Sequence, residues 1–178
     1  MTRGRFIVLE GGEGAGKTTQ AALLSAWLTA AGIRHRLARE PGGTPVGEAI
    51  RSVVLGRTDL EMPAESELFL ILAARAAFVR DVVRPALEAG EMVVADRFAL
   101  SPLAYQGYGR GLDLGEVRHA VALATGGLEP DLYVVLDVPV ALGAERQRHG
   151  GKRPDRIEGE GDAFLRRVRN GYLQLAER

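Results

Sequence analysis

The sequence contains no cysteine, which excludes disulfide bonds and cysteine-ligated zinc sites. No apolar run approaches the ~20 residues that a membrane-spanning helix needs, and the N-terminus lacks the apolar stretch of a signal peptide. Acidic and basic residues balance at 23 each, so no global charge favours nucleic acid or an anionic membrane as a partner. We therefore expect one cytoplasmic domain over residues 1–178 that binds neither nucleic acid nor membrane.

Clusters of catalytic or metal-ligating side chains are also missing from the sequence. The three histidines, His35, His119 and His149, are scattered along the chain, which argues against a Ser-His-Asp triad. If the acceptor of a transferred group is itself a phosphate, its oxygens are already ionised at neutral pH. Catalysis then depends on positioning and on charge neutralisation by lysine, arginine and magnesium.

Lysine is scarce, because only Lys17 and Lys152 are lysines among the 23 basic residues. Lys17 follows an apolar run at residues 6–9, which predicts a buried strand, and then four glycines within residues 11–16. The spacing G-x-x-x-x-G-K-T is typical of a loop whose backbone N–H groups surround a polyphosphate at a helix N-terminus. We expect Lys17 to reach the outer phosphates and the Thr18 hydroxyl to hold magnesium. The residues predicted to bind the nucleotide are Gly11, Gly12, Glu13, Gly14, Ala15, Gly16, Lys17, Thr18 and Thr19.

Strand and helix patterns alternate along the rest of the chain. Short apolar runs predict strands over residues 33–38, 92–95 and 132–136. Helical periodicity predicts helices over residues 17–31, 46–55, 64–89 (with a break near Pro85), 114–125, 140–148 and 163–177. A further helix begins at Ser101 and is expected to fade at the glycine-rich residues 106–109. This alternation predicts an α/β protein with a mostly parallel sheet covered by helices on both faces.

Charged residues follow three of the predicted strands, and in a parallel sheet these ends lie at one edge. Glu10 runs into the phosphate loop, residues 39–40 are Arg-Glu, and residues 96–97 are Asp-Arg. We expect Asp96 to hold magnesium through water rather than to cap a helix. We expect Arg97 to clamp a phosphate, and an ion pair with Asp96 or Glu40 is the alternative.

Arginines at two other places are candidates for substrate contacts. Arg75 lies among four alanines and needs a partner, for which a substrate or a buried carboxylate would serve equally well. Residues 146–158 combine basic side chains with Gly150-Gly151, and we interpret this segment as a mobile lid rather than as a solvated charged face. A lid arginine would stabilise charge on a phosphoryl group during transfer, and closure of the lid would exclude water.

Several motifs occur in order along nearly the whole chain. They are residues 10–19 (EGGEGAGKTT), 39–44 (REPGGT) with Gly47, Glu48 and Arg51, 73–75 (AAR), 96–98 (DRF) with Ser101, 104–107 (AYQG), 136–137 (LD), 155–158 (DRIE) and 171–173 (GYL). With these motifs the sequence resembles the bacterial thymidylate kinase (dTMP kinase) family of P-loop nucleoside-monophosphate kinases. The phosphate loop alone indicates only the superfamily, whereas the EPGGT and DRF…AYQG segments are specific.

The resemblance implies a three-layer P-loop NTPase fold with a mobile lid, and a homodimer formed through helices. It implies transfer of the γ-phosphoryl group of ATP to dTMP with magnesium, giving ADP and dTDP. A kinase for another pyrimidine monophosphate, such as dUMP or UMP, and a non-catalytic ATP-binding module are the alternatives. The implied dTMP-binding residues are Glu13, Arg51, Ile71, Arg75, Arg97, Ser101, Tyr105 and Gln106. The implied catalytic residues are Lys17, Arg97, Arg148, Lys152 and Arg153, and the metal-binding residues are Thr18 and Asp96.

Individual roles follow from the same resemblance. Glu13 would contact the sugar 3′-hydroxyl, Arg51 and Arg97 the acceptor phosphate, and Arg75 the edge of the thymine. Gly14 stands where some family members carry a catalytic arginine. Arg148, Lys152 or Arg153 of the lid would then supply that charge.

The sequence departs from the family pattern at two places. Ile71 stands where the family usually has a phenylalanine stacked on thymine, and an aliphatic side chain loses about 0.5–1.5 kcal/mol of ring–ring interaction. Phe69 does not replace it, because residues two apart on a helix do not share a face. The family also continues past position 178 with a strand and a helix, so we expect either that the sequence is clipped or that the sheet lacks that final edge strand and helix.

Overall fold

The computed structural model describes residues 3–149 and 155–177. The strands are β1 (Phe6–Gly11), β2 (His35–Arg39), β3 (Met92–Asp96) and β4 (Leu132–Leu136). The helices are α1 (Lys17–Ala30), α2 (Pro45–Gly56), α3 (Ala64–Phe78), η1 (Val79–Val83), α4 (Arg84–Glu88), α5 (Leu100–Pro102), η2 (Leu103–Gly109), α6 (Leu114–Thr125), α7 (Val140–His149), η3 (Glu158–Glu160) and α8 (Asp162–Ala176). η1 and η2 are π-helical, and η3 is a 3₁₀ turn.

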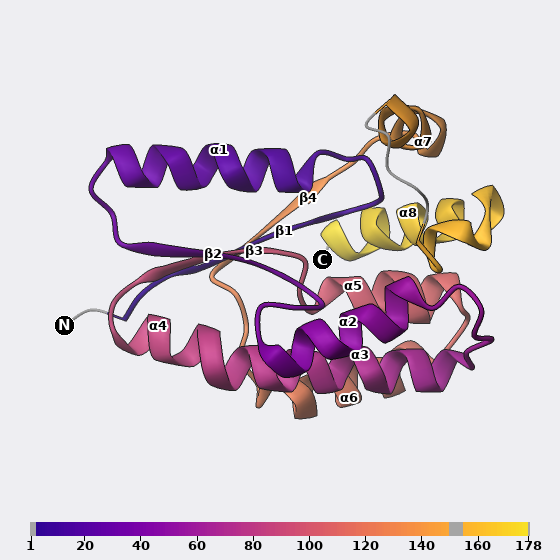
Figure 1. Ribbon diagram of the computed structural model, residues 1–178, viewed down its shortest axis with the longest axis horizontal. Coiled ribbons are helices and arrows are strands. Elements are labelled where there is room, and N and C mark those ends of the chain that lie inside the picture. Colours follow the sequence, from indigo (N-terminus) through magenta and orange to yellow (C-terminus); the bar gives the residue numbers. More distant parts are fainter. Residues whose placement is uncertain (1–2, 150–154, 178) are drawn as a thin grey trace.

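The four described strands form one parallel sheet in the order β2-β3-β1-β4. Helix α1 covers one face, the helices from α2 to α6 cover the other, and α7 and α8 lie near the ends of β1 and β4 (Figure 1). The predicted three-layer α/β arrangement is confirmed. Within the described residues β4 forms one edge of the sheet. No described helix is both long and apolar enough to cross a membrane.

Alternation along the strands divides the core into two clusters. Phe6 and Val8 of β1 face the larger cluster, which packs against α3, η2 and α8, and the Phe6 ring meets the Phe98 ring edge-on at 4.9 Å. Leu9 and Val94 face the other side and pack under α1. Since successive strand residues point to opposite faces, the central strands β1 and β3 are mostly apolar on both faces, whereas the edge strand β2 carries His35, Arg36 and Arg39.

Local sequence signals explain several helix ends. The Thr44 hydroxyl accepts a hydrogen bond from Gly47 N at 2.9 Å at the start of α2, and Pro45 occupies the first turn. The Asp113 carboxylate accepts one from Glu116 N at 2.9 Å at the start of α6, and Gly126 ends that helix in the left-handed conformation.

Two helix predictions differ from the structure. The helix predicted over residues 64–89 does not break at Pro85, which sits in the first turn of α4; the chain widens into the π turn of η1 before it. The helix from Ser101 does not fade at residues 106–109, because η2 continues through Gly109. A Cβ at Gly109 would lie 2.7 Å from the Phe164 ring, so this glycine permits close packing against α8 rather than ending the helix.

Candidate active site

The register of the sheet brings the polar strand ends together. Asp96 of β3 is opposite both Leu9 of β1 and Arg39 of β2. The backbone continues this pairing beyond the strands, because Glu40 N donates to Asp96 O and Arg97 N to Leu9 O, both at 2.9 Å. The predicted convergence of these charged residues at one edge is therefore confirmed.

The phosphate loop connects β1 to the N-terminus of α1, as predicted. Gly11, Gly14 and Gly16 have positive φ angles of 136°, 68° and 96°. Side chains other than glycine rarely adopt such angles, so these positions keep the loop in its compact turn. The turn places backbone N–H groups at the positive end of the α1 dipole, which is a favourable environment for an anion.

Lys17 lies at the base of this loop with only 7% of its surface exposed. Its ammonium donates to Gly11 O at 3.0 Å and to Gly12 O at 2.7 Å. Burial, together with the charge of Arg97, lowers the pKa of Lys17 to about 8. The Lys17 side chain is therefore a cation beside the loop at neutral pH, and it loses its proton at mildly alkaline pH.

Thr18 and Asp96 form the oxygen pair that the sequence predicts for a metal. The Thr18 hydroxyl donates to Asp96 Oδ2 at 2.7 Å. Asp96 does not cap a helix, because the next helix, α5, has Ala99 at its N-cap. Hydroxyl and carboxylate oxygens suit magnesium, which usually takes one or two protein oxygens together with phosphate oxygens. No cluster of three or more acidic, histidine or cysteine ligands occurs among the described residues, so the donor set fits an ion shared with a phosphate ligand.

Glu10 is a fully buried carboxylate that holds the chain after β3 against β1. It accepts hydrogen bonds from Phe98 N at 2.8 Å and from Ser101 N and Oγ at 3.2 and 2.7 Å. The Tyr172 hydroxyl of α8 donates to it at 2.9 Å. Several donors stabilise a buried carboxylate that would otherwise be costly.

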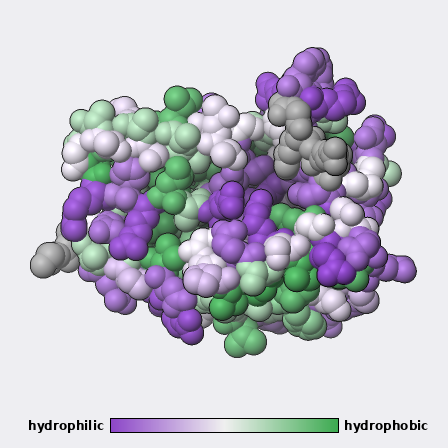
Figure 2. Space-filling model, viewed as in Figure 1, coloured by the Kyte–Doolittle hydropathy of each residue, from purple (hydrophilic) through white to green (hydrophobic). Residues whose placement is uncertain are grey.

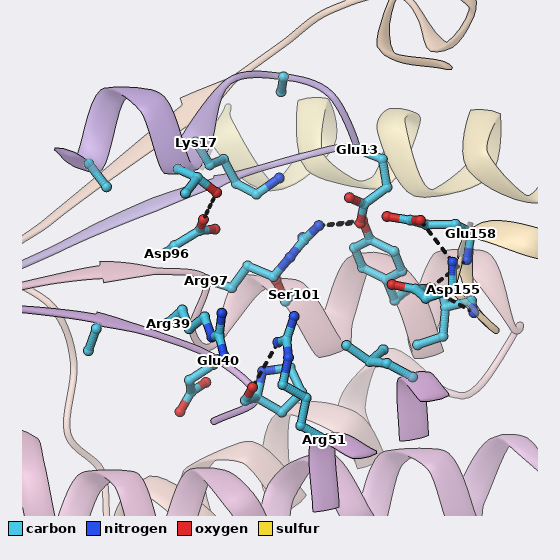
Figure 3. Close-up of a pocket in the computed structure, with 18 of the residues that line it drawn as sticks. Glu13, Lys17, Arg39, Glu40, Arg51, Asp96, Arg97, Ser101, Asp155 and Glu158 are labelled. Atoms are coloured by element: carbon cyan, nitrogen blue, oxygen red, sulfur yellow. Dashed lines mark hydrogen bonds and ion pairs between the residues drawn. The ribbon is translucent and has the colours of Figure 1, made fainter. Parts of the chain in front are cut away.

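Arg97 follows β3 with a positive φ of 78°, which no other described non-glycine residue has. This turn directs its side chain toward the phosphate loop and Glu13 (Figure 3). The guanidinium forms an ion pair with Glu13 and donates to Gly11 O at 3.1 Å and to the Tyr105 hydroxyl at 2.9 Å. The predicted alternative of an ion pair with Asp96 or Glu40 is wrong, because the carboxylate that Arg97 reaches is Glu13.

Arg75 and Glu40 form a buried ion pair. Arg75 Nη2 lies 2.6 Å from Glu40 Oε2, and the two side chains are 1% and 2% exposed. Burial raises the pKa of Glu40, and the charge of Arg75 opposes that rise. A buried carboxylate is thus one partner of Arg75, as one sequence-based alternative proposed, while Arg75 Nη1 has no hydrogen-bond partner among the described residues.

The remaining residues predicted to contact dTMP line the same cavity of about 1010 Å³. Its lining includes Arg51, Ile71, Ser101, Tyr105 and Gln106. Arg51 Nη1 donates to Pro41 O at 2.9 Å, and the Tyr105 hydroxyl donates to Glu13 at 2.8 Å. The Gln106 amide oxygen is buried without a partner among the described residues.

Ile71 is 9% exposed whereas Phe69 is 65% exposed, so the prediction that Phe69 points away from the pocket is confirmed.

This cavity is lined both by the phosphate loop and by buried polar atoms that have no partner within the described residues. Comparison with known proteins shows which family has this sequence and fold. The family model for thymidylate kinase matches residues 9–178. The chain belongs to the thymidylate kinase family. It is 54% identical to thymidylate kinase of Desulforudis audaxviator, covering 97% of this chain and 78% of the relative. It is 53% identical to that of Deinococcus radiodurans, covering 99% and 84%.

A solved structure is also similar. The crystal structure of thymidylate kinase from Ehrlichia chaffeensis has a TM-score of 0.81 and 30% sequence identity, and covers 98% of this chain and 87% of that one. Membership of the family therefore rests on both sequence and fold.

The predicted lid is only partly a loop. Arg146 and Arg148 lie in α7, which extends to His149, and η3 covers Glu158–Glu160. Two predicted catalytic residues, Lys152 and Arg153, lie outside the described residues. Arg148 is exposed and does not line the cavity, whereas Arg146 lines it and donates from Nη1 to Gly14 O at 3.2 Å.

Gly14 and Gly143 let α7 approach the phosphate loop. A Cβ at Gly14 would lie 2.3 Å from Gly143 O, and a Cβ at Gly143 would lie 2.3 Å from Glu13 O. Both positions therefore require glycine if α7 is to lie this close. The sequence identified Gly14 as a position without arginine, and the structure adds that it is a contact surface for α7.

Several cavity residues were absent from the predicted site. Arg39 and Ile157 line the cavity along with Arg146. Arg39 could have been recognised, because it directly follows a predicted strand and precedes Glu40. Ile157 lies in the DRIE motif, but an apolar residue in a charged segment gives no indication of substrate contact.

The pKa of Lys17 predicts how anion binding depends on pH. Below pH 8 the Lys17 ammonium is charged and attracts phosphate, and above pH 8 the neutral Lys17 amine must take up a proton before it can bind a polyphosphate as a cation. The affinity for ATP should therefore be nearly constant from pH 6.5 to 7.5 and then fall by up to about tenfold per pH unit. Isothermal titration calorimetry from pH 6.5 to 9.5 measures this.

Lys17→Met is the matched control, because it keeps most of the side-chain volume without a titrating group. Its weaker binding should show no such decline across the same range. A wild-type affinity that stayed level to pH 9.5 would contradict the low pKa of Lys17.

Proposed function

We propose that this protein transfers the γ-phosphoryl group of ATP to dTMP, giving ADP and dTDP for dTTP synthesis. The observation that carries the proposal is that one cavity is lined both by the phosphate loop and by Arg75 and Gln106. In that cavity a donor, Arg75 Nη1, and two acceptors, Gln106 Oε1 and Glu40 Oε1, have no partners among the described residues, and the first two together offer a ligand one donor and one acceptor. Buried polar groups are normally hydrogen-bonded, so this pair supports a ligand that supplies the missing partners.

The base edge of thymine offers the complement of these two groups. Its O4 atom accepts a hydrogen bond, which suits Arg75 Nη1, and its N3–H donates one, which suits Gln106 Oε1. Cytosine presents an amino group at position 4 and an acceptor at N3, so both contacts would be mismatched. A mismatch that leaves buried polar groups unpaired is costly, and this favours thymine and uracil over cytosine.

The acceptor phosphate of dTMP must be held in position, but it needs no general base because its oxygens are already ionised. A phosphate oxygen of dTMP attacks the γ-phosphorus, and the bond to the β–γ bridging oxygen breaks, so that ADP leaves with the bonding electrons. Arg51 and Arg97 would hold the attacking phosphate. When phosphate binds, Arg97 would exchange its ion pair with Glu13 for phosphate oxygens, and this would free the Glu13 carboxylate to accept the sugar 3′-hydroxyl.

Magnesium is the cofactor that we propose on the ATP side. The Thr18 hydroxyl and the Asp96 carboxylate, the latter through water, would hold it next to the phosphate loop. When bound, the ion would neutralise charge on the phosphates. Lys17 and the loop N–H groups bind the same phosphates and orient them for transfer.

Neutralising the charge on the transferred phosphoryl group requires a further cation, and the lid (residues 146–158) is the proposed source. Arg148, Lys152 and Arg153 are the proposed donors, and Arg146 joins them because it already contacts the phosphate loop. The contact of an arginine with the γ-phosphoryl group strengthens as charge develops in the transition state.

A substrate panel tests the proposed function. Coupled measurement of ADP release with dTMP, dUMP, UMP and dCMP should give the highest kcat/KM for dTMP. Lys17→Ala should lower dTMP turnover at least about 10²–10³-fold, because it removes a cation from the reacting phosphates. Retained circular dichroism would show that this variant is folded. A clear preference for another monophosphate, or unchanged turnover in Lys17→Ala, would overturn the proposal.

A lid variant separates binding from transfer. Arg153→Ala should lower kcat by about 10²-fold or more while the KM for dTMP changes by less than about threefold. Arg118→Ala, an exposed arginine on α6, is the matched control and should leave both constants unchanged. A defect confined to dTMP binding would argue against a lid role in the transition state.

A homodimer through helices is part of the same proposal. Phe69 of α3 and Leu123 of α6 are 65% and 85% exposed, and hydrophobic residues gather along the lower edge of Figure 2, over the helices on that side. Large exposed apolar side chains on neighbouring helices favour a protein interface.

Light scattering after size exclusion tests the dimer. The protein should have twice the mass of one chain, and Phe69→Glu should shift it toward the monomer. Leu23→Glu, on exposed α1, should not change the mass. A monomeric wild type would refute the dimer.

The nucleotide substrates of the proposed reaction favour a cytoplasmic location for this protein, which cell fractionation would check.

A further inference from the structure

A buried carboxylate on α3 contacts one of the proposed base-binding residues. Glu67 is fully buried, and Gln106 Nε2 donates to its Oε1 at 2.8 Å. Arg110 donates through Nε to Oε1 at 3.2 Å and through Nη2 to Oε2 at 2.9 Å. Arg156 also donates to Oε2. The sequence indicated no function for Glu67.

These contacts keep the carboxylate ionised. Burial disfavours the charged form of Glu67, but hydrogen bonds from Arg110, Gln106 and Arg156 outweigh it and lower the pKa of the carboxyl. An ionised carboxylate only accepts hydrogen bonds. The part of the Gln106 amide that faces Glu67 must therefore be the nitrogen.

The two ends of a glutamine amide have opposite hydrogen-bonding character, so turning the amide over would reverse what it offers to a ligand. With Nε2 held by Glu67, the end left for a ligand is Oε1, which has no partner among the described residues. Gln106 is fully buried and lines the cavity, so water in bulk does not compete for this oxygen.

We infer that Glu67 is a specificity-determining positioning residue, which fixes the Gln106 amide so that the site demands a hydrogen-bond donor at N3 of the pyrimidine. Glu67 does not touch the substrate itself. The inference rests on the proposed function, since it assumes that Gln106 meets the base edge of the monophosphate.

The test compares dUMP with dCMP, which both lack the 5-methyl group and differ at position 4 and N3. In Glu67→Gln, the new amide can offer either oxygen or nitrogen to Gln106, so the Gln106 amide is free to turn over. The dUMP-to-dCMP ratio of kcat/KM should fall by at least about tenfold. The dTMP-to-dUMP ratio should stay unchanged, because it reports only the methyl contact.

Three variants separate positioning from a general structural effect. Arg110→Gln removes one cationic partner of Glu67 but leaves the Glu67 carboxylate in place as the acceptor for Gln106 Nε2. The dUMP-to-dCMP ratio of this variant should therefore match that of the wild type. Glu67→Asp keeps the charge for Arg110 and Arg156 and should fold even if Glu67→Gln does not. Its shorter side chain weakens the contact with Gln106, and the dUMP-to-dCMP ratio should fall partway. In a Gln106→Leu background, Glu67→Gln should have no further effect on that ratio.

The outcomes distinguish this inference from the proposed function. Wild-type protein that phosphorylates no dTMP would end the proposed function. Normal dTMP turnover with an unchanged dUMP-to-dCMP ratio in the Glu67 variants would overturn the inference alone. Equal loss of both ratios, or an undiminished effect of Glu67→Gln without the Gln106 amide, would also overturn it, because Glu67 would then act on the whole pocket.

Discussion

The structure depends most on the buried carboxylate of Glu10. It collects hydrogen bonds from the backbone after β3, from Ser101 and from Tyr172 of α8, so three separate parts of the chain meet at one side chain. Because Phe98 N is held there, the preceding residue turns through a positive φ and Arg97 extends toward the phosphate loop. The position of the Arg97 side chain is thus set by an acid that lies behind it.

The same arrangement recurs under the rest of the cavity. Glu40 holds Arg75 from behind, and Glu67 holds Gln106. In each pair a buried acid occupies one side of a polar group, and another atom of that group has no partner in the described part of the chain. Arginine and glutamine suit this task because each carries several polar atoms in a fixed plane, whereas a lysine has one point of charge.

The sequence was sufficient for the parts of the site that depend on local pattern. Gly11 to Thr18 follow the spacing of a phosphate loop, and Asp96 ends a strand that pairs with β1, so parallel pairing places it at the edge of the sheet where that loop begins. The ion pair of Arg97 with Glu13 could not be predicted, because it joins residues from different elements. Glu67 was missed because an acid near the start of a helix is usually exposed, and its burial follows from Arg110 and Arg156 far along the chain.

Helix predictions were least accurate where glycine had a packing role. Gly109 looked like a helix end, but it is the point where a bulky ring of α8 packs closely. Gly14 and Gly143 likewise permit close packing, in this case between the phosphate loop and α7. Since a Cβ at Gly14 would overlap the backbone of α7, a side chain in the loop and a closely docked α7 exclude each other. An arginine could therefore enter at position 14 only if α7 moved away. An arginine at position 14 and Arg146 on a closely docked α7 are thus alternative sources of positive charge, and a substitution that introduces the first requires changes that displace the second.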